Sequence, residues 1–131
     1  MQKLILDPTW ESTLSIADSE VIQKKFSSTV DDHDCLAAVP IWKAVNHKGD
    51  LLITALIHNR TSENIIVFDR KVVYLEGGSV VASHIFTIKR LVIGANCSTP
   101  WTFIFPRGTF QEKQLAIQGR EEVKSGELRL S

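Results

Sequence analysis

The sequence predicts a mainly β protein: an immunoglobulin-like antiparallel β-sandwich with an N-terminal helical segment. Three observations support this prediction. After residue 38, apolar residues recur with the period of two typical of strands, and turn residues interrupt them about every ten residues. Before residue 27 the spacing of apolar residues is helical. Strands and helices do not alternate along the chain, which argues against a parallel, doubly wound sheet.

Length and charge limit the function classes. The chain has 131 residues, the size of one domain, and such a domain buries about two thirds of its unfolded surface. Fifteen acidic residues balance fifteen basic ones, and the charges are interspersed, so no basic patch for nucleic acid or an anionic membrane is present. The apolar start is too short for a signal peptide, and no segment approaches the ~20 apolar residues of a membrane span. We therefore expect a cytoplasmic protein.

The two cysteines, Cys35 and Cys97, are expected to be reduced thiols in that compartment. A disulfide between them is the less favoured alternative. They lack the Cys-x-x-Cys spacing of a redox or metal motif, and no neighbouring group activates Cys97, so an inert thiol is favoured there. The cysteines therefore indicate no chemistry.

The helical segment is expected over residues 7–27, as one bent helix or two short ones. Asp7 followed by Pro8 is typical of a helix N-cap with proline at the first helical position. Ser15 resembles a second cap, after which an apolar stripe at helical spacing ends with Phe26. We expect this segment to pack on an edge or end of the sandwich.

The strands follow from alternation and from turn residues. Residues 51–59 form the clearest strand, with apolar side chains at every second position. The alternation changes phase across residues 69–71, which predicts a bulge or a crossing between sheets. Gly77-Gly78 between two apolar runs is the strongest hairpin signal in the chain.

An aromatic strand is expected after Pro100. Trp101, Phe103 and Phe105 lie at every second position, so all three rings share one face of the strand. They represent the largest block of apolar area that the chain can bury. We expect this strand to be the main aromatic part of the core.

The chain is expected to be one domain over residues 1–118, with the helical lead at 7–27 and the sandwich at 38–118. Residues 114–118 are predicted to be the last strand. Residues 119–131 show no periodicity and are predicted to be a flexible tail.

Residues that could support catalysis or metal binding are few. Residues 31–35 (Asp-Asp-His-Asp-Cys) could hold a divalent cation, but no calcium-loop glycine is present and a solvated acidic loop is favoured. No nucleophile motif accompanies the isolated histidines, so structural or surface roles are favoured for them. These histidines are His33, His47, His58 and His84. We predict no metal, no cofactor and no enzymatic activity.

Four segments together resemble the SLAP domain family, which occurs, often in two copies, in S-layer assembly proteins of the accessory Sec system of bacilli. They are the opening at residues 6–11 (Leu-Asp-Pro-Thr-Trp-Glu), a strand ending at Asn59, a hairpin return through Phe86, and the block 100–106 (Pro-Trp-Thr-Phe-Ile-Phe-Pro). The resemblance covers residues 4–118 as a single copy. The motif residues, which the resemblance implies to be mainly structural, are Pro8, Trp10, Glu11, Phe26, Asn59, Phe86, Pro100, Trp101, Phe103 and Phe105.

The resemblance implies a non-enzymatic cytoplasmic factor that helps to deliver S-layer precursors to the accessory Sec translocase. Its partners would be proteins, namely the precursor or the accessory Sec ATPase. A sheet edge or an apolar groove near the helix would hold an extended segment by strand addition. The alternative is an immunoglobulin-like protein-interaction module unrelated to S-layer export. An enzyme, the third option, would need His58, His84 and the acidic loop to converge in a cleft.

Overall fold

The computed structural model describes residues 2–29, 34–110 and 119–131. The elements are β1 (Lys3–Leu4), α1 (Pro8–Thr13), α2 (Ile16–Thr29), β2 (Leu36–Val45), β3 (Leu51–Asn59), β4 (Ile65–Glu76), β5 (Ser79–Ile93), β6 (Cys97–Phe105), β7 (Glu121–Glu122) and β8 (Gly126–Leu130). The predicted mainly β class with an N-terminal helical segment is confirmed.

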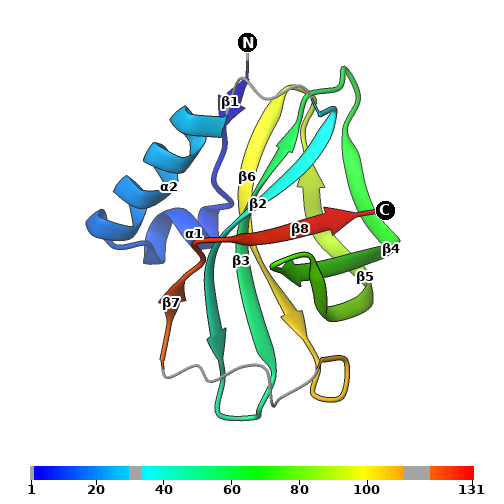
Figure 1. Ribbon diagram of the computed structural model, residues 1–131. Helices are drawn as coiled ribbons and strands as arrows, with labels where there is room; N and C mark the ends of the chain where they lie inside the picture. The colour runs from blue at the N-terminus through cyan, green and yellow to red at the C-terminus, as the bar shows by residue number, and fades with distance from the viewer. Residues whose placement is uncertain (1, 30–33, 111–118) are drawn as a thin grey trace.

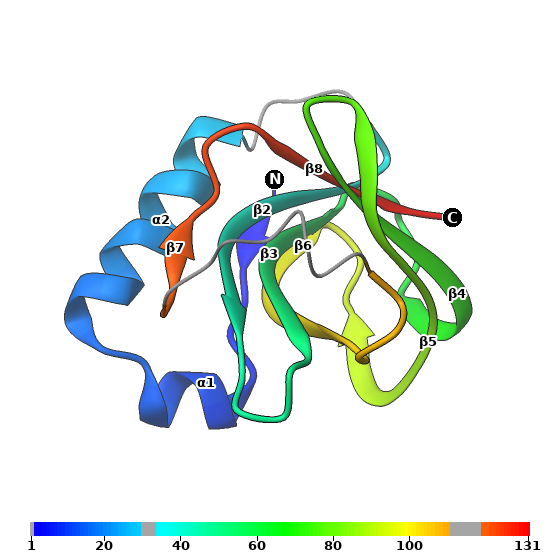
Figure 2. The same ribbon diagram turned by 60° about the horizontal axis from the view of Figure 1, so that its bottom comes forward.

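The strands form one curled sheet of eight strands, in the order β1-β6-β3-β2-β8-β4-β5, with β7 paired to β2 beside this path. Neighbouring strands are antiparallel except β1 and β6, which are parallel, so the sheet is mixed. β4 and β5 face β6, β3 and β2 across the interior (Figures 1 and 2). β8 pairs with β2 on one side and with β4 on the other, and it therefore joins the two layers.

Aromatic side chains fill the interior between these layers. The ring of Phe86 on β5 makes edge contacts with Phe103 and Phe105 on β6, with centroids 5.4 and 5.2 Å apart. Phe103 and Phe105 are fully buried, and Trp101 is half-buried against the same core. The prediction that this aromatic strand supplies the core is confirmed.

A second apolar cluster lies on the outer face of the sheet, beneath α2. Ile22 of α2 is buried against Ile41 and Trp42 of β2 and Leu56 of β3. Half-buried side chains complete this outer cluster, namely Leu4, Trp10, Leu14, Val21 and Phe26. Figure 2 shows α2 outside the curled sheet, on the side away from β4 and β5.

The helix starts follow the predicted caps, and the segment is two helices. The Asp7 carboxylate accepts a hydrogen bond from the Thr9 N–H at 2.9 Å, and Pro8 is the first residue of α1. The Ser15 hydroxyl accepts from the Asp18 N–H at 3.1 Å at the start of α2. Both caps satisfy backbone N–H groups that the helix itself leaves unpaired.

The predicted turn and bulge are also confirmed. Gly77 and Gly78 have φ of +57° and +81°, the left-handed values that a tight two-residue hairpin turn between β4 and β5 requires. The register of β4 against β5 shifts between Val67 and Arg70, where Asp69 has φ of +47°. This bulge lies at the phase change seen in the sequence.

The prediction of a flexible tail at residues 119–131 is wrong. β8 pairs with both β2 and β4, and Leu128 and Val123 are buried. The alternation in β8 extends over too few residues to be recognised in the sequence. The strands that pair with β8 lie far away along the chain, so they give no local signal either. The domain therefore extends past residue 118. The strand predicted at residues 114–118 lies outside the described residues.

Candidate functional site

Most residues of the family motif have structural positions. Phe86, Phe103 and Phe105 lie in the inner core, whereas Trp10 and Phe26 belong to the outer cluster. Pro8 starts α1, and Pro100 is buried within β6. All seven residues were predicted to be mainly structural. In the described part of the chain, none of them lines any of the three cavities that are discussed below.

Asn59, at the end of β3, holds two loops together. It is fully buried, and its amide nitrogen donates to the carbonyls of Glu63 at 2.8 Å, Ile93 at 2.9 Å and Gly94 at 3.0 Å. Its oxygen accepts from the Thr61 N–H at 3.0 Å and from the Thr61 hydroxyl at 2.7 Å. The amide thus uses its full hydrogen-bonding capacity within the fold.

Trp101 lies beside a contact that links the two ends of the curled sheet. The guanidinium of Arg90 on β5 lies 5.8 Å from the Trp101 ring centroid and donates to Asp7 at 2.8 Å. Asp7 follows β1, the strand at the opposite end of the sheet order. The backbone N–H of Thr9, followed by the hydrogen bond and charge of Arg90, holds the pKa of Asp7 below its ordinary value.

His58 and His84 occupy separate environments. His58 is fully buried on β3, where Nε2 contacts the Thr29 hydroxyl at 2.7 Å and Nδ1 contacts the Ser98 hydroxyl at 2.5 Å. Thr29 donates its own proton to the Lys25 carbonyl at 2.7 Å, so Nε2 of His58 is the donor toward Thr29. His84 packs edge-on against Phe86, with centroids 4.8 Å apart. His58 thus ties the end of α2 to β3 and β6.

The acidic loop at residues 31–35, predicted to be solvated rather than metal-binding, lies mostly outside the described residues, which include only Asp34 and Cys35 of it. Within the part of the chain that the structure describes, no three His, Cys, Asp or Glu side chains gather closely enough to hold a metal ion. Cys35 is exposed, Cys97 is half-buried, and both thiols are free.

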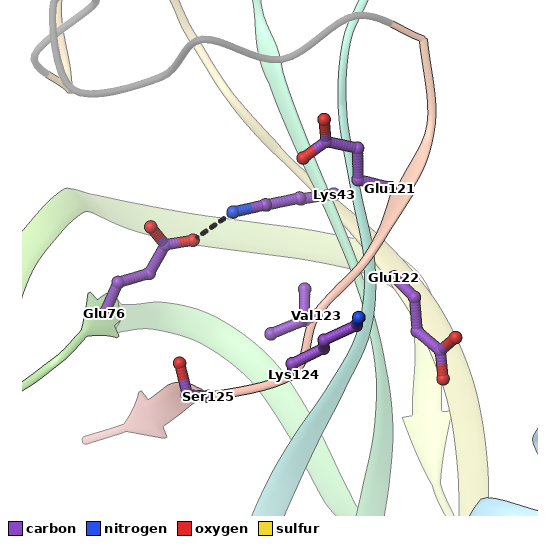
Figure 3. Close-up of a pocket in the computed structure, with 7 residues that line it drawn as sticks. All are labelled: Lys43, Glu76, Glu121, Glu122, Val123, Lys124 and Ser125. Atoms are coloured by element: carbon purple, nitrogen blue, oxygen red, sulfur yellow. Dashed lines mark hydrogen bonds and ion pairs between the residues drawn. The ribbon is translucent and has the colours of Figure 1, made fainter.

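A polar pocket of about 490 Å³ lies between β2, the end of β4 and residues 121–125. Lys43 donates to the Glu76 carboxylate at 2.7 Å (Figure 3), and the buried Tyr74 hydroxyl donates to the same oxygen at 2.6 Å. Burial has the largest effect on the pKa of Glu76 and raises it. The hydrogen bonds from Lys43 and Tyr74, together with the Lys43 charge, outweigh burial, so the pKa lies below its ordinary value.

Two charged residues that line this pocket pair with each other. Lys43 and Glu76 neutralise each other, and Glu122 points away from them (Figure 3). The sequence did not reveal this pair because its members are 33 residues apart and residues 121–125 were predicted to be a tail. The ion pair links β2 to the end of β4, the two strands between which β8 pairs, and so stabilises the position of β8.

Two adjoining hollows of about 420 and 360 Å³ lie between β1, α1 and α2. Both are lined by Leu6, Glu11, Leu14 and Ser19, and we call them together the β1 groove. Leu4, Ile5, Ile22 and Gln23 line its inner part, and Ser15, Ile16 and Glu20 line its outer part. In Figures 1 and 2 both helices lie beside the N-terminal strand, where this groove forms.

The β1 groove lies along an edge of the sheet. β1 is the terminal strand in the sheet order. The Lys3 N–H donates to the Asn96 carbonyl at 3.0 Å and the Ile5 N–H to the Ser98 carbonyl at 2.8 Å, so both groups face β6. Because peptide groups alternate in direction along a strand, the N–H and C=O of Leu4 face the opposite side. The geometry can therefore accept an additional extended strand.

Glu11 is the one member of the predicted motif set that lines the β1 groove as the structure describes it. The sequence prediction included Glu11 as a motif residue at a helix start. The groove itself was expected only in general terms, as an apolar groove near the helix, because its walls come from segments whose relative placement is tertiary.

Comparison with known proteins gives one match. The family model of the SLAP domain matches residues 4–121 of the chain. No curated protein and no solved structure matches it. Of the helices that the structure describes, none has the length and apolar character needed to cross a membrane. The matched range covers most of the 131 residues, including the two helices and β2 to β6. The chain belongs to the SLAP domain family.

Proposed function

We propose that this protein is a non-enzymatic binding factor of the cytoplasm that assists the export of S-layer precursors through the accessory Sec pathway. Its partner is the precursor or the accessory Sec ATPase. Membership of the SLAP domain family supports the pathway. The observation that carries the binding role is the β1 groove, a hollow lined by both apolar and polar side chains beside the terminal strand of the sheet.

The physical mechanism is strand addition. Main-chain hydrogen bonds to an edge strand supply affinity for any extended segment, and pockets for alternate side chains supply selectivity. A precursor that has not yet folded offers such segments, because its backbone groups are still unpaired. A complex of this kind holds the precursor unfolded without any covalent chemistry.

A pull-down tests this proposal. Tagged protein is mixed at low salt with an S-layer precursor, with the accessory Sec ATPase, and with an unrelated exported protein as the control. We expect retention of the precursor or the ATPase but not of the control. The proposal is refuted if the protein retains neither partner while its circular dichroism spectrum shows that it is folded.

The second candidate function is a protein-interaction module with no role in S-layer export. An exposed apolar group on the outer face of β4 and β5 favours it. Ile66, Phe68 and Val92 are 59%, 66% and 51% exposed, and Ile66 pairs directly with Val92 in the sheet register. Genes for S-layer proteins and a second Sec ATPase beside this gene favour export. Their absence, together with an effect of Phe68→Ser on partner capture, favours the module.

A further inference from the structure

We propose that the β1 groove binds an extended, apolar segment of the export precursor that carries a lysine or arginine. This inference rests on the proposed function and specifies the chemistry of the segment. It follows from three properties of the groove: its apolar lining, its unneutralised carboxylates and its strand edge.

The apolar lining is unusually open to solvent. Ile16, at the first position of α2, is 81% exposed, and Ile5 is 49% exposed. Ile5 lines the inner hollow and Ile16 the outer one, and the half-buried Leu6 and Leu14 line both. A ligand that covers these apolar side chains removes their area from water, and this removal favours binding. The groove therefore favours apolar side chains in its occupant.

The charge of the lining has one sign. Glu11 and Glu20 line the groove, and none of the lysines or arginines that the structure describes does. The nearby carboxylates of Asp7 and Asp18 are neutralised by Arg90 and Arg120. Glu11 and Glu20 have no ion pair within the described residues. Their carboxylates can therefore pair with a charged group of the bound segment, and they favour a cationic side chain over an anionic one.

The strand edge determines the conformation of the occupant. The Leu4 peptide group faces away from β6, and an extended segment beside it can pair with that group while its alternate side chains enter the groove. A helix cannot pair in this way because its backbone groups bond to one another. Extended, apolar and cationic together define the segment.

Peptide binding tests the chemistry. The probe is a fluorescein-labelled Lys-Val-Thr-Val-Thr-Val peptide, followed by fluorescence anisotropy with the full chain at low salt. A peptide with glutamate in place of the lysine is expected to bind at least about 5-fold more weakly. A peptide methylated at alternate backbone nitrogens is expected to lose binding, because it cannot donate to an edge strand. Equal affinity for all three peptides overturns the inference.

Protein variants locate the site. Glu11→Gln and Glu20→Gln are each expected to lower the affinity for the lysine peptide by about 2- to 5-fold. Neither variant is expected to lower the affinity for the glutamate peptide. Ile16→Ser is expected to weaken both by roughly 5-fold. The matched controls, Glu63→Gln and Ile85→Ser, alter exposed residues outside the groove and should change nothing. Equal effects of groove and control variants contradict the assignment.

The precursor pull-down separates this inference from the proposed function. Loss of precursor capture in a Glu11→Gln, Glu20→Gln, Ile16→Ser variant supports both. Capture that persists in that variant overturns the groove assignment but leaves the proposed function standing. Charge-selective peptide binding without any precursor capture overturns the precursor as the source of the segment. It refutes the proposed function as well if the accessory Sec ATPase is not captured either.

Discussion

The interior of the curled sheet and its outer face under α2 both bury apolar side chains, but they differ in how they are closed. In the interior, Phe86, Phe103 and Phe105 meet from β5 and β6, and strands surround them. On the outer face, Ile22 is the one buried residue of the described helices. The outer cluster is therefore thinner, and the open groove lies beside it. A binding surface is expected where packing is least complete.

The largest expected effect concerns the interior. Phe103→Ala should reduce the free energy of unfolding by about 3–5 kcal/mol, because a fully buried ring is lost and a cavity remains. Ile104→Ala, at a position 49% exposed on the same strand, is the control and should cost less than about 0.5 kcal/mol. Urea unfolding measures both. Similar losses in the two variants would mean that Phe103 is not a core ring.

Ile22→Ala tests the outer cluster. We expect a loss of about 2–4 kcal/mol in unfolding free energy, from the transfer and cavity effects of a buried isoleucine. Amide hydrogen exchange should accelerate in α2 while β6 stays protected, because the helix packs on the sheet from outside. Lys24→Ala, exposed on the same helix, is the control. Equal acceleration in α2 and β6 would show that the two regions unfold as one unit.

Tyr74 links the interior to the polar pocket and makes stability depend on pH. Burial, then the hydrogen bond to Glu76 and its charge, raises the pKa of Tyr74 above its ordinary value of 10.0. Its contribution to stability is therefore fully present below pH 10.0 and is lost as the pH rises above that value. Tyr74→Phe should cost about 1.5–3 kcal/mol at neutral pH, because the hydrogen bond to a charged acceptor is removed.

Two measurements check the Tyr74 prediction. Urea unfolding above pH 10 should show the alkaline loss in the wild type and a smaller loss in Tyr74→Phe. Tyr74 is the chain's only tyrosine, so a spectrophotometric titration reports on it alone. A tyrosine that titrates in the folded protein at its ordinary pKa would contradict both its burial and its bond to Glu76.

Gly126→Ala tests the placement of β8 between β2 and β4. A Cβ at this position would lie 2.5 Å from Cγ1 of Val123 and 2.9 Å from the Tyr74 hydroxyl. We expect a loss of about 1–3 kcal/mol from overpacking. Thermal unfolding of Gly126→Ala against Glu127→Ala, an exposed neighbour, measures the difference. An unchanged midpoint in both would support the flexible tail that the sequence suggested.

The smallest expected effect concerns the ion pair that ties α2 to the segment before β7. The hydrogen bond from Arg120, with its charge, lowers the pKa of Asp18 below its ordinary value of 3.8, although burial opposes this. The stabilisation is present above that pH and is lost as the pH falls through the lowered pKa. Asp18→Asn should cost only about 0.2–1 kcal/mol at neutral pH, because both side chains are partly solvated. The difference between wild type and variant should shrink as the pH falls below 3.8.

Local signals in the sequence sufficed for the elements whose partners are nearby along the chain. Asp7-Pro8 started a helix, Gly77-Gly78 made a hairpin, and the alternation at residues 101–105 placed Phe103 and Phe105 inward. The motif segments also identified the family. Each of these depends on the conformational preferences or side-chain period of a few consecutive residues.

The tertiary structure alone decided the rest. It placed β8 between β2 and β4, paired Lys43 with Glu76, and joined the strands into one curled sheet. It also brought Glu11 and Glu20 into one groove beside β1. The free energy of these arrangements comes from pairing and packing between segments distant in sequence, and such contacts leave no periodic signal in either segment. The sequence by itself therefore determined the class, the family and the aromatic core, whereas the candidate binding surface was decided by the tertiary fold.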